Sequence, residues 1–521
     1  MQNHRQQPIP DLPPLPPLPL SRYLEALGDM VLDFRGDPAA TIAGADSDSR
    51  LVGPGDLFVA IPGAQLDGAA FIPQAMAAGA TAIVSETILE TKPPINYVRV
   101  SDAYHAAGAI AEVLHRHPLQ KLRTVGITGT NGKTTCAFLL RDMLRRAGLK
   151  TGLIGTVHYQ FGEQTIPASL TTPTPFELQR VMRQMVEART EWLVMEVSSH
   201  ALAQHRLGKG QLQAALFTNL TGDHGDYHRS RKNYFQAKQR LFTEHLEKRA
   251  PAMINQDDLH GRKLRRLLLE DGSTRPLGFA IRHQADLQVE QAKTTLQGTQ
   301  FRLLDRQRKR TLSLASPLIG RFNVMNTAGA AALAWELGLP EDEIKQACAL
   351  FKGAPGRLEP VPGEQDYRVF VDYAHTDDAL KNVLQALRRL KPARLSVVFG
   401  CGGDRDREKR PRMGRVAARL ADRIYLTSDN PRSEPSDTII EDIRQGIPAN
   451  ADCIIIEDRR QAIRQAMAKA QPGEVILIAG KGHENYQIVG SQRLPFDDRV
   501  EALKAMQVRT AGCLGTAGLR R

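Results

Sequence analysis

The sequence predicts an α/β protein organised in three blocks, and three observations lead to that fold class. Its 521 residues exceed one core of ordinary size, so two to four domains are expected. Short apolar runs alternate with helical stretches along most of the chain, which predicts parallel sheets covered by helices. One of these runs leads into a glycine-rich loop followed by a helix, an arrangement typical of nucleotide-binding proteins.

The chain begins with a proline-rich arm, residues 1–20, which has no uninterrupted apolar core of the signal-peptide kind. We interpret residues 8–19 as a polyproline II-like stretch in a disordered leader, with partner binding as the alternative. The first block covers residues 21–118. Its β-like runs, 56–61 and 82–84, are separated by helical stretches.

The second block covers residues 119–352 and opens with a buried strand at 123–127. That strand enters the glycine-rich loop, and the helix that follows runs to Arg146 and stops near Gly148. The third block covers residues 353–508 and alternates strand and helix again. Its apolar runs are 369–371, 395–399, 424–426 and 475–478. The last residues, 509–521, form a tail without an assigned role.

Composition argues against several classes of protein. No apolar run reaches the roughly 18 residues needed to cross a bilayer, so no membrane span is expected. The five cysteines form no close pair, which argues against a zinc site or a disulfide scaffold and favours a reducing cytoplasm. The net charge of +12 raises nucleic-acid binding as an alternative, but the arginines scatter along the chain. We therefore expect a basic surface or anionic substrates, and no nucleic-acid partner.

Most of the polar motifs in the second and third blocks come directly after an apolar run, where open α/β sheets bind ligands. The clearest is Gly-Ile-Thr-Gly-Thr-Asn-Gly-Lys-Thr-Thr at 126–135. Its glycines let backbone amides curl around phosphate oxygens, while Lys133 would reach the β- and γ-phosphates and Thr134 would bind magnesium. The strict pattern has glycine where this chain has Ile127, so the loop is a variant. A structural turn without nucleotide is the alternative.

A second magnesium ligand is expected from a neighbouring strand end. Glu196 follows the strand-like run 192–195, and His224 comes after the next run, 214–217. Mg²⁺ prefers oxygen ligands, with phosphates and water completing its octahedron. Glu196 suits this role well, whereas His224 is a less typical ligand and read alone favours a structural histidine.

The ordered motifs resemble those of the Mur ligase family over about residues 45–505. The motifs that carry the resemblance lie at 129–135, 171–173, 196–200, 219–228, 237–238, 323–326, 356–357, 372–375, 402–405, 429–432 and 480–484. The resemblance implies three domains. The first holds uridine diphosphate, the central one is a P-loop ATPase with a mostly parallel sheet, and the C-terminal one is Rossmann-like and receives an amino acid.

The resemblance also implies an activity, in which ATP drives the joining of meso-2,6-diaminopimelate to UDP-N-acetylmuramoyl-L-alanyl-D-glutamate. This step belongs to cytoplasmic peptidoglycan precursor synthesis and passes through an acyl phosphate. ATP is the co-substrate and Mg²⁺ the cofactor. We expect the chain to act as a monomer.

By position, the resemblance assigns four sets of residues. The catalytic set is Lys133, Glu196, His224 and Lys238. Lys238 is expected as N6-carboxylysine, and the metal ligands as Thr134, Glu196, His224 and Lys238 in that carbamylated form. The ATP set is Gly129, Thr130, Asn131, Gly132, Lys133, Thr134, Thr135, Asn323, Arg357, Asp372 and His375. The set for the UDP-linked dipeptide is Ser47, Ser49, Ala64, Gln65, Thr171, Thr172, Ser198, Gln204 and Arg206. The diaminopimelate set is Arg405, Asp429, Asn430, Pro431, Arg432, Gly480 and Glu484.

Arg432 bears on the choice of amino acid. Asp-Asn-Pro is good turn chemistry, but a turn does not require the arginine that follows it. A guanidinium grips a carboxylate with two parallel hydrogen bonds, and diaminopimelate has a second carboxylate that lysine lacks. The resemblance agrees, since lysine-adding relatives lack this arginine. Asn430 and Glu484 are expected to hold the nearby ammonium, and Arg405 a carboxylate.

The sequence departs from the family pattern at two positions. Leu170 stands where relatives can carry asparagine, which removes one substrate hydrogen bond, and Asp377 stands where proline is expected, which alters a turn. Three alternatives are a lysine-adding or folate-type amide ligase, a P-loop protein that moves nucleic acid, and a nucleotide-binding module without catalysis. The second leaves the motifs of the third block unexplained, and the intact catalytic set argues against the third.

Overall fold

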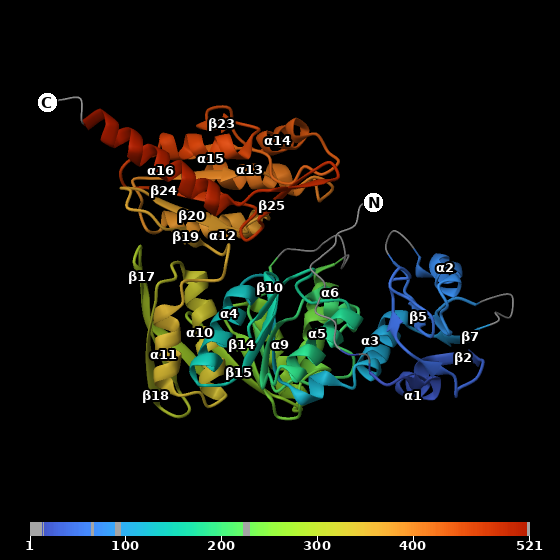
Figure 1. Ribbon diagram of the computed structural model, residues 1–521. Helices are drawn as coiled ribbons and strands as arrows, with labels where there is room; N and C mark the ends of the chain where they lie inside the picture. The colour runs from blue at the N-terminus through green and yellow to red at the C-terminus, as the bar shows by residue number, and fades with distance from the viewer. Residues whose placement is uncertain (1–12, 14, 64–66, 89–94, 222–229, 518–521) are drawn as a thin grey trace.

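The computed structural model describes residues 13, 15–63, 67–88, 95–221 and 230–517, with side chains up to residue 507. Three lobes follow one another along the chain, and each carries one large sheet (Figure 1). The first and central lobes lie side by side, and the third lies above the central lobe. No helix in the described ranges is both long and apolar enough to cross a membrane.

The first lobe contains a five-stranded sheet in the order β2-β7-β6-β5-β4, with β2 as an antiparallel edge. Its elements are α1 (Leu20–Leu27), β2 (Val31–Arg35), β4 (Ala45–Asp46), β5 (Leu57–Ala60), α2 (Ile72–Ala77), β6 (Ala82–Ser85), β7 (Asn96–Val100) and α3 (Ala103–Leu114). β1 (Leu18–Pro19) pairs with β3 (Thr41–Ile42). Folded structure is therefore already present at Leu18, inside the segment assigned to the arm, because Leu18 and Leu20 pack into this lobe's core.

The central lobe is built on an eleven-stranded sheet in the order β11-β10-β9-β12-β8-β13-β14-β15-β16-β17-β18. The seven middle strands, β9, β12, β8, β13, β14, β15 and β16, run parallel. β10 and β11 at one edge and β17 and β18 at the other pair antiparallel. The strands are β8 (Arg123–Thr128), β9 (Thr151–Ile154), β10 (His158–Phe161), β11 (Gln164–Pro167), β12 (Trp192–Glu196), β13 (Ala214–Phe217), β14 (Pro251–Asn255), β15 (Arg275–Ala280), β16 (Leu287–Thr295), β17 (Gly298–Asp305) and β18 (Arg310–Ser316).

Helices cover both faces of the central sheet. They are α4 (Lys133–Arg146), α5 (Pro175–Glu187), α6 (Ser199–Ala203), α8 (Arg231–Thr243), α9 (Leu259–Asp271), α10 (Arg321–Glu336) and α11 (Glu341–Leu350). One core packs α4, α10 and α11 against the sheet, and a second core packs α5, α8 and α9 against it. Burial on both faces explains why the middle strands are almost wholly apolar. The predicted strand–loop–helix unit and the α/β fold class are confirmed.

The third lobe has a six-stranded sheet in the order β19-β20-β24-β21-β22-β23, parallel apart from its edge strand β19. The strands are β19 (Glu359–Val361), β20 (Arg368–Asp372), β21 (Arg394–Phe399), β22 (Arg423–Leu426), β23 (Cys453–Ile455) and β24 (Glu474–Ala479). Other elements are α12 (Asp377–Arg388), α13 (Lys409–Leu420), α14 (Ser436–Arg444), α15 (Arg459–Ala468), the hairpin β25 (Tyr486–Val489) and β26 (Gln492–Pro495), and α16 (Asp498–Ala517). α16 continues past residue 508, where the sequence predicted the tail to begin.

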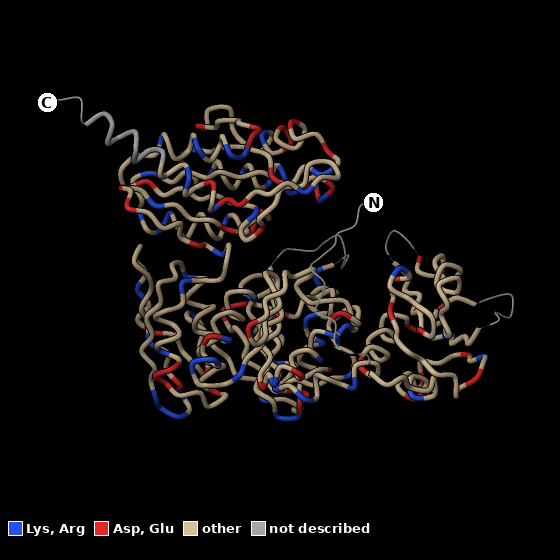
Figure 2. The backbone as a smooth tube through the Cα atoms, in the orientation of Figure 1, with Lys and Arg blue, Asp and Glu red and all other residues tan. Residues whose placement is uncertain are grey.

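Charged residues are spread over all three lobes, and Figure 2 shows Lys and Arg on every lobe rather than in one stripe. Many form local ion pairs with neighbouring carboxylates, such as Arg308 with Glu336 and Arg388 with Asp422. A dispersed pattern of this kind fits a solvated basic surface better than a nucleic-acid footprint.

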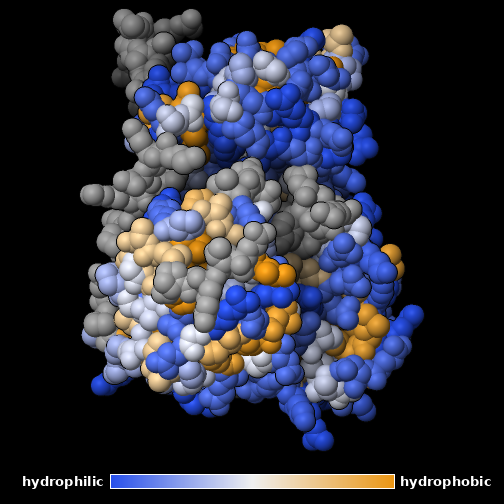
Figure 3. All heavy atoms as spheres, turned by 90° about the vertical axis from the view of Figure 1, so that its right-hand side faces the viewer, coloured by the Kyte–Doolittle hydropathy of each residue, from blue (hydrophilic) through white to orange (hydrophobic). Residues whose placement is uncertain are grey.

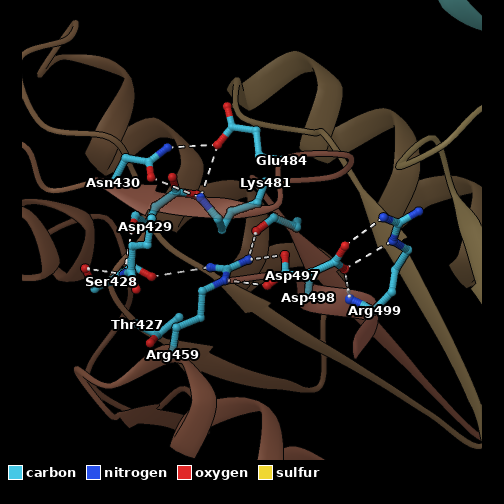
Figure 4. Close-up of polar contacts among 12 residues, drawn as sticks. Thr427, Ser428, Asp429, Asn430, Arg459, Lys481, Glu484, Asp497, Asp498 and Arg499 are labelled. Carbon is cyan, nitrogen blue, oxygen red and sulfur yellow. Dashed lines mark hydrogen bonds and ion pairs between the residues drawn. The ribbon is translucent and has the colours of Figure 1, made fainter. Parts of the chain in front are cut away.

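A fully buried ion pair ties two helices of the third lobe to its sheet. Arg459 donates to both carboxylate oxygens of Asp498 at 2.7 and 2.8 Å, and neither side chain is exposed (Figure 4). The same guanidinium donates to the backbone oxygens of Ser428 and Ala479. The Ser428 oxygen lies just after β22 and the Ala479 oxygen at the end of β24, so one arginine joins the ends of the two strands that flank β21 in the sheet.

Arg459→Met should destabilise the third lobe by about 3–5 kcal/mol, because it leaves the Asp498 carboxylate buried without its partner. Hydrogen–deuterium exchange of β24 measures the local free energy of opening. Arg460→Met is the matched control. Arg460 is 45% exposed and pairs with Glu501, so its loss should change stability by less than about 1 kcal/mol. Equal effects of the two substitutions would contradict the role given to the buried pair.

Candidate functional site

A cavity of about 1690 Å³ lies between the central and third lobes, at the carboxyl ends of their parallel strands. Figure 3 shows a hollow below the upper lobe, and the underside of that lobe is mostly hydrophilic there. Residues expected to bind ligands line this cavity from both lobes. They are Thr171, His375, Arg405, Asp429, Asn430, Arg432, Gly480 and Glu484.

The phosphate loop lies between β8 and α4, as the sequence predicts. Gly132 adopts φ +89, and a Cβ atom there would collide with the side chain of Asn326. Lys133 is the first residue of α4, and its Nζ donates to the backbone oxygens of Gly129 and Thr130, each at 2.9 Å. The N-terminus of a long helix therefore points at the loop, which favours an anion such as phosphate.

The Glu196 carboxylate is the polar centre of this region. It is fully buried at the end of β12 and accepts three hydrogen bonds. Thr134 Oγ1 and Thr156 Oγ1 donate to Oε2 at 2.9 and 3.0 Å, and the Thr156 amide donates to Oε1 at 2.9 Å. The sequence-predicted pair Thr134 and Glu196 is thus in direct contact.

The oxygen atoms of Thr134 and Glu196 suit Mg²⁺, which in nucleotide sites takes one or two protein oxygens besides phosphate oxygens and water. Among the described residues, no three His, Cys, Asp or Glu side chains are grouped closely enough to hold a metal on their own. The donor set therefore fits a metal that arrives with a nucleotide. His224 lies outside the described residues.

Lys238 is buried on α8 beside the phosphate loop. Its Nζ donates to the backbone oxygen of Gly129 at 2.9 Å and lies 4.6 Å from the centre of the Tyr234 ring. Tyr234 in turn shares a hydrogen bond with Thr130, with 3.2 Å between the two hydroxyl oxygens. A lysine in a helix ordinarily lies on the surface, whereas the fold buries Lys238 beside the phosphate loop.

Two residues of the ATP set reach the site from the third lobe. Arg357 Nη2 donates to Thr134 Oγ1 at 3.3 Å, and its guanidinium lies over the Tyr373 ring at 4.9 Å. His375 packs edge-on against the Tyr373 ring and lines the cavity. Asn131 of the phosphate loop also contacts Asp378 Oδ2, at 3.4 Å. The third lobe therefore closes one side of the nucleotide region.

The remaining residues of the ATP set lie inside the protein. Asp372 accepts hydrogen bonds from the backbone amides of Leu358 and Ala374 at 2.6 and 2.8 Å. Burial raises the pKa of Asp372 to about 6, while the nearby Arg357 guanidinium opposes that rise. Asn323 accepts from Asn326 at 3.2 Å and so supports the loop indirectly, and Thr135 is buried in α4.

The residues assigned to the muramoyl-dipeptide form a second cluster, centred on Thr172. Arg206 donates to the Thr172 backbone oxygen at 2.6 Å and to Gln204 Oε1 at 2.7 and 3.0 Å. The Ser198 amide donates to Thr172 Oγ1 at 3.0 Å. Thr171 faces the cavity, as does Leu170, whose side chain is 43% exposed.

The residues assigned to the uridine end lie in the first lobe, away from this cavity. Ser47 and Ser49 follow β4, and Ser49 Oγ donates to Gln74 Oε1 at 3.1 Å. Neither lines the large cavity. Ala64 and Gln65 lie outside the described residues.

The diaminopimelate set comes from three loops of the third lobe. Gly480 has φ +114, and a Cβ there would lie 2.5 Å from Asp429 Oδ2, so these two loops touch. Arg432 has φ +53, and its Nη1 donates to the Gly403 backbone oxygen at 2.8 Å and to that of Asn430 at 3.4 Å. All members line the cavity except Pro431.

Sequence reasoning gave no role to three residues of the site. Thr156 binds both oxygens of Glu196, Tyr234 contacts the phosphate loop, and Lys481 is buried among the amino-acid loops. Thr156 comes shortly after β9, so the strand-end rule would have found it. Lys481 lies inside the motif at 480–484, but its burial carries no local signal.

The chain matches three family models. Residues 127–334 match "Mur ligase middle domain", residues 356–482 match "Mur ligase, glutamate ligase domain", and residues 41–117 match "Mur ligase family, catalytic domain". These models together cover more than half of the chain and fall on the three lobes in order.

Individual relatives match over nearly the whole length. The UDP-N-acetylmuramoyl-L-alanyl-D-glutamate–2,6-diaminopimelate ligase of Gloeobacter violaceus is 42% identical, covering 94% of this chain and 99% of that protein. The ligase of the same name from Thermosynechococcus vestitus is 44% identical, covering 88% of this chain and 91% of that protein. A solved structure of an enzyme with this name has a TM-score of 0.66 at 33% identity, over 94% and 99%. MurF from Acinetobacter baumannii shares the fold, with a TM-score of 0.61 at 19% identity over 95% and 99%.

Gly132→Ala should weaken nucleotide binding by about tenfold or more, because the added Cβ displaces Asn326 and strains a left-handed residue beside the phosphates. Titration with a fluorescent ATP analogue measures the dissociation constant. Gly148→Ala is the matched control, since Gly148 has φ +80 and a Cβ added there would meet nothing within 4 Å. Normal binding by a folded Gly132→Ala protein would remove this loop from nucleotide recognition.

Proposed function

This chain belongs to the Mur ligase family, and from that premise we propose that it uses ATP to join meso-2,6-diaminopimelate to UDP-N-acetylmuramoyl-L-alanyl-D-glutamate. Relatives named for this reaction match the chain over more than 90% of their own length. We further propose a cytoplasmic location. We also propose action as a monomer.

One observation carries the proposal. A single cavity is lined by Thr156 and Thr171, next to the buried Glu196, and by Asp429 and Glu484 on the opposite lobe. A ligase must bring an activated carboxyl group and an amine together. The shared cavity offers one wall for each reactant, and proximity of this kind accounts for a large part of such a rate enhancement.

The chemistry follows from the poor reactivity of a carboxylate at neutral pH. A carboxylate oxygen of the dipeptide bonds to the γ-phosphorus of ATP while the bond to the ADP oxygen breaks, which gives an acyl phosphate and ADP. The deprotonated amine then bonds to the acyl carbon, and inorganic phosphate leaves with the electron pair of the broken C–O bond. The products are an amide, ADP and phosphate.

In the first step, the chain's own groups position the reactants and neutralise the charge of the phosphates. Lys133 and the amides at the start of α4 would hold the phosphates, with Thr130, Asn131 and Gly129 shaping the loop around them. Thr134 and Glu196 would hold Mg²⁺, which when bound neutralises charge on the transferred phosphoryl group. Arg357, already in contact with Thr134, would order the same region from the third lobe.

In the second step the third lobe selects the amine. Arg405 and Arg432 would each grip a carboxylate, and Glu484 the ammonium. When lysine binds instead of diaminopimelate, Arg432 loses its anionic partner in a partly desolvated site, which is costly. The hydrogen bonds that Arg432 makes among the described residues use only Nη1. Its Nε–Nη2 edge therefore offers the geometry for a bidentate carboxylate.

The unaltered protein should ligate meso-diaminopimelate in preference to L-lysine, and Arg432→Ala should reduce that preference by about 10- to 100-fold. Ligation with purified UDP-linked dipeptide, ATP, Mg²⁺ and a panel of amino acids measures both. Arg419→Ala, an exposed arginine of α13, is the control. Equal or better incorporation of lysine by the unaltered protein would overturn the assignment.

Lys238→Ala should lower ligation by at least about 100-fold and recover in part when short carboxylic acids are added, because we propose that carbamylated Lys238 supplies a carboxylate that orients a metal. Lys232→Ala, on the exposed face of the same helix, should keep normal activity. Density for a plain ammonium at Lys238, in a structure with nucleotide and substrate bound, would contradict carbamylation.

A further inference from the structure

Lys481 is a buried cation in the middle of the proposed amino-acid site, and the assignments above give it no role. It follows Gly480 directly and has no exposed surface. Its Nζ donates to Asn430 Oδ1 at 3.0 Å and to Glu484 Oε2 at 3.1 Å (Figure 4). The Tyr486 ring lies 5.5 Å from the same atom.

A buried ammonium needs partners to offset its lost hydration. In the described part of the chain, both hydrogen-bond partners of Lys481 are side chains that line the large cavity. A lysine that served only to hold the loops together would be satisfied equally well by backbone oxygens. Arg459, for example, binds the backbone of these same loops. The choice of partners therefore links Lys481 to the ligand side of the loops.

The contacts of Asn430 fix which way its amide faces. Oδ1 accepts from Lys481 Nζ and from the Ile488 amide at 2.9 Å, and both of these groups are donors only. The oxygen must therefore face them, and Nδ2 donates to Glu484 Oε2 at 2.9 Å. With both lone pairs of Oδ1 in use, Asn430 has no acceptor left for a ligand ammonium. This differs from the expectation that Asn430 shares the ammonium with Glu484.

Glu484 is fixed in a complementary way. Its Oε2 accepts from both Lys481 and Asn430, so the second oxygen, Oε1, is left for the cavity that Glu484 lines. The side chain is 16% exposed, which agrees with one buried and one accessible oxygen. The two loops that follow β22 and β24 thus present one carboxylate oxygen in a set direction.

We infer that Lys481 is a positioning residue for the amino-acid substrate. Its ammonium binds Asn430 Oδ1, so that Asn430 Nδ2 faces Glu484 as a donor. It also binds Glu484 Oε2, which leaves Oε1 as the acceptor for the substrate's ammonium. This inference rests on the proposed function. It predicts that Lys481 affects the binding of the amino acid and leaves the binding of ATP and the UDP-linked substrate almost unchanged.

The test is a comparison of Lys481→Met with the unaltered enzyme by steady-state kinetics, varying one substrate at a time. The KM for diaminopimelate should rise by about 10- to 100-fold, the factor expected for losing charge-assisted hydrogen bonds. The KM values for ATP and the UDP-linked dipeptide should change by less than about threefold. Lys481→Arg keeps a cation and should lie between the two proteins. Lys469→Met, an exposed lysine of the same lobe, should match the unaltered enzyme.

An unchanged KM for diaminopimelate, or an equal rise in all three KM values, would overturn the inference, since a merely structural lysine gives the latter. If circular dichroism shows that Lys481→Met does not fold, Lys481→Gln takes its place, because it keeps one donor for Asn430. If the unaltered protein fails to ligate diaminopimelate, the proposed function alone fails. The same comparison is then made with whichever amino acid the unaltered protein ligates.

Discussion

The central lobe depends on one buried carboxylate. Glu196 has no exposed surface, and its three hydrogen bonds come from the start of α4 and from the loop after β9. A carboxylate in such a position is stable only while its donors stay in place. The phosphate loop, the loop that carries Thr156 and the end of β12 are therefore held in fixed relation before any ligand binds. Preorganisation of this kind lowers the reorganisation needed in the transition state.

The third lobe fixes its strand ends by a different means. Arg459 and Arg410 are both fully buried, and each pairs with a carboxylate while binding backbone oxygen of a cavity-lining loop or its neighbour. Lys481 adds a third buried cation, next to Asn430 and Glu484. Each of these cations balances the charge of the carboxylate beside it, and for Lys481 that carboxylate is Glu484, which is proposed to bind the substrate's ammonium. The central lobe uses neutral hydroxyl donors around Glu196, where a metal would supply the positive charge.

The two sites become one because the lobes share a cavity. Arg357 and Asp378 reach from the third block of the sequence to Thr134 and Asn131 of the phosphate loop. The phosphate loop therefore directly contacts the lobe that carries Arg432 and Glu484.

The sequence by itself determined the α/β class, the strand–loop–helix unit around Lys133, and the placement of Glu196 and Asp429 at strand ends. Each of these is a local pattern, because apolar runs and glycine spacing record burial and backbone shape over a few residues. The role of Arg432 was inferred from guanidinium chemistry together with the substrate that the family resemblance implies.

Only the tertiary structure decided which side chains meet. Thr156 reaches Glu196 because β9 lies beside β12, and Lys481 reaches Asn430 across 51 residues of sequence. β24 lies between β20 and β21, although β21, β22 and β23 precede it in the chain. Local periodicity carries no information about that order. The burial of Lys481 and Lys238, and the direction of the Asn430 amide, follow from strand order and packing, which arise from contacts distant in sequence.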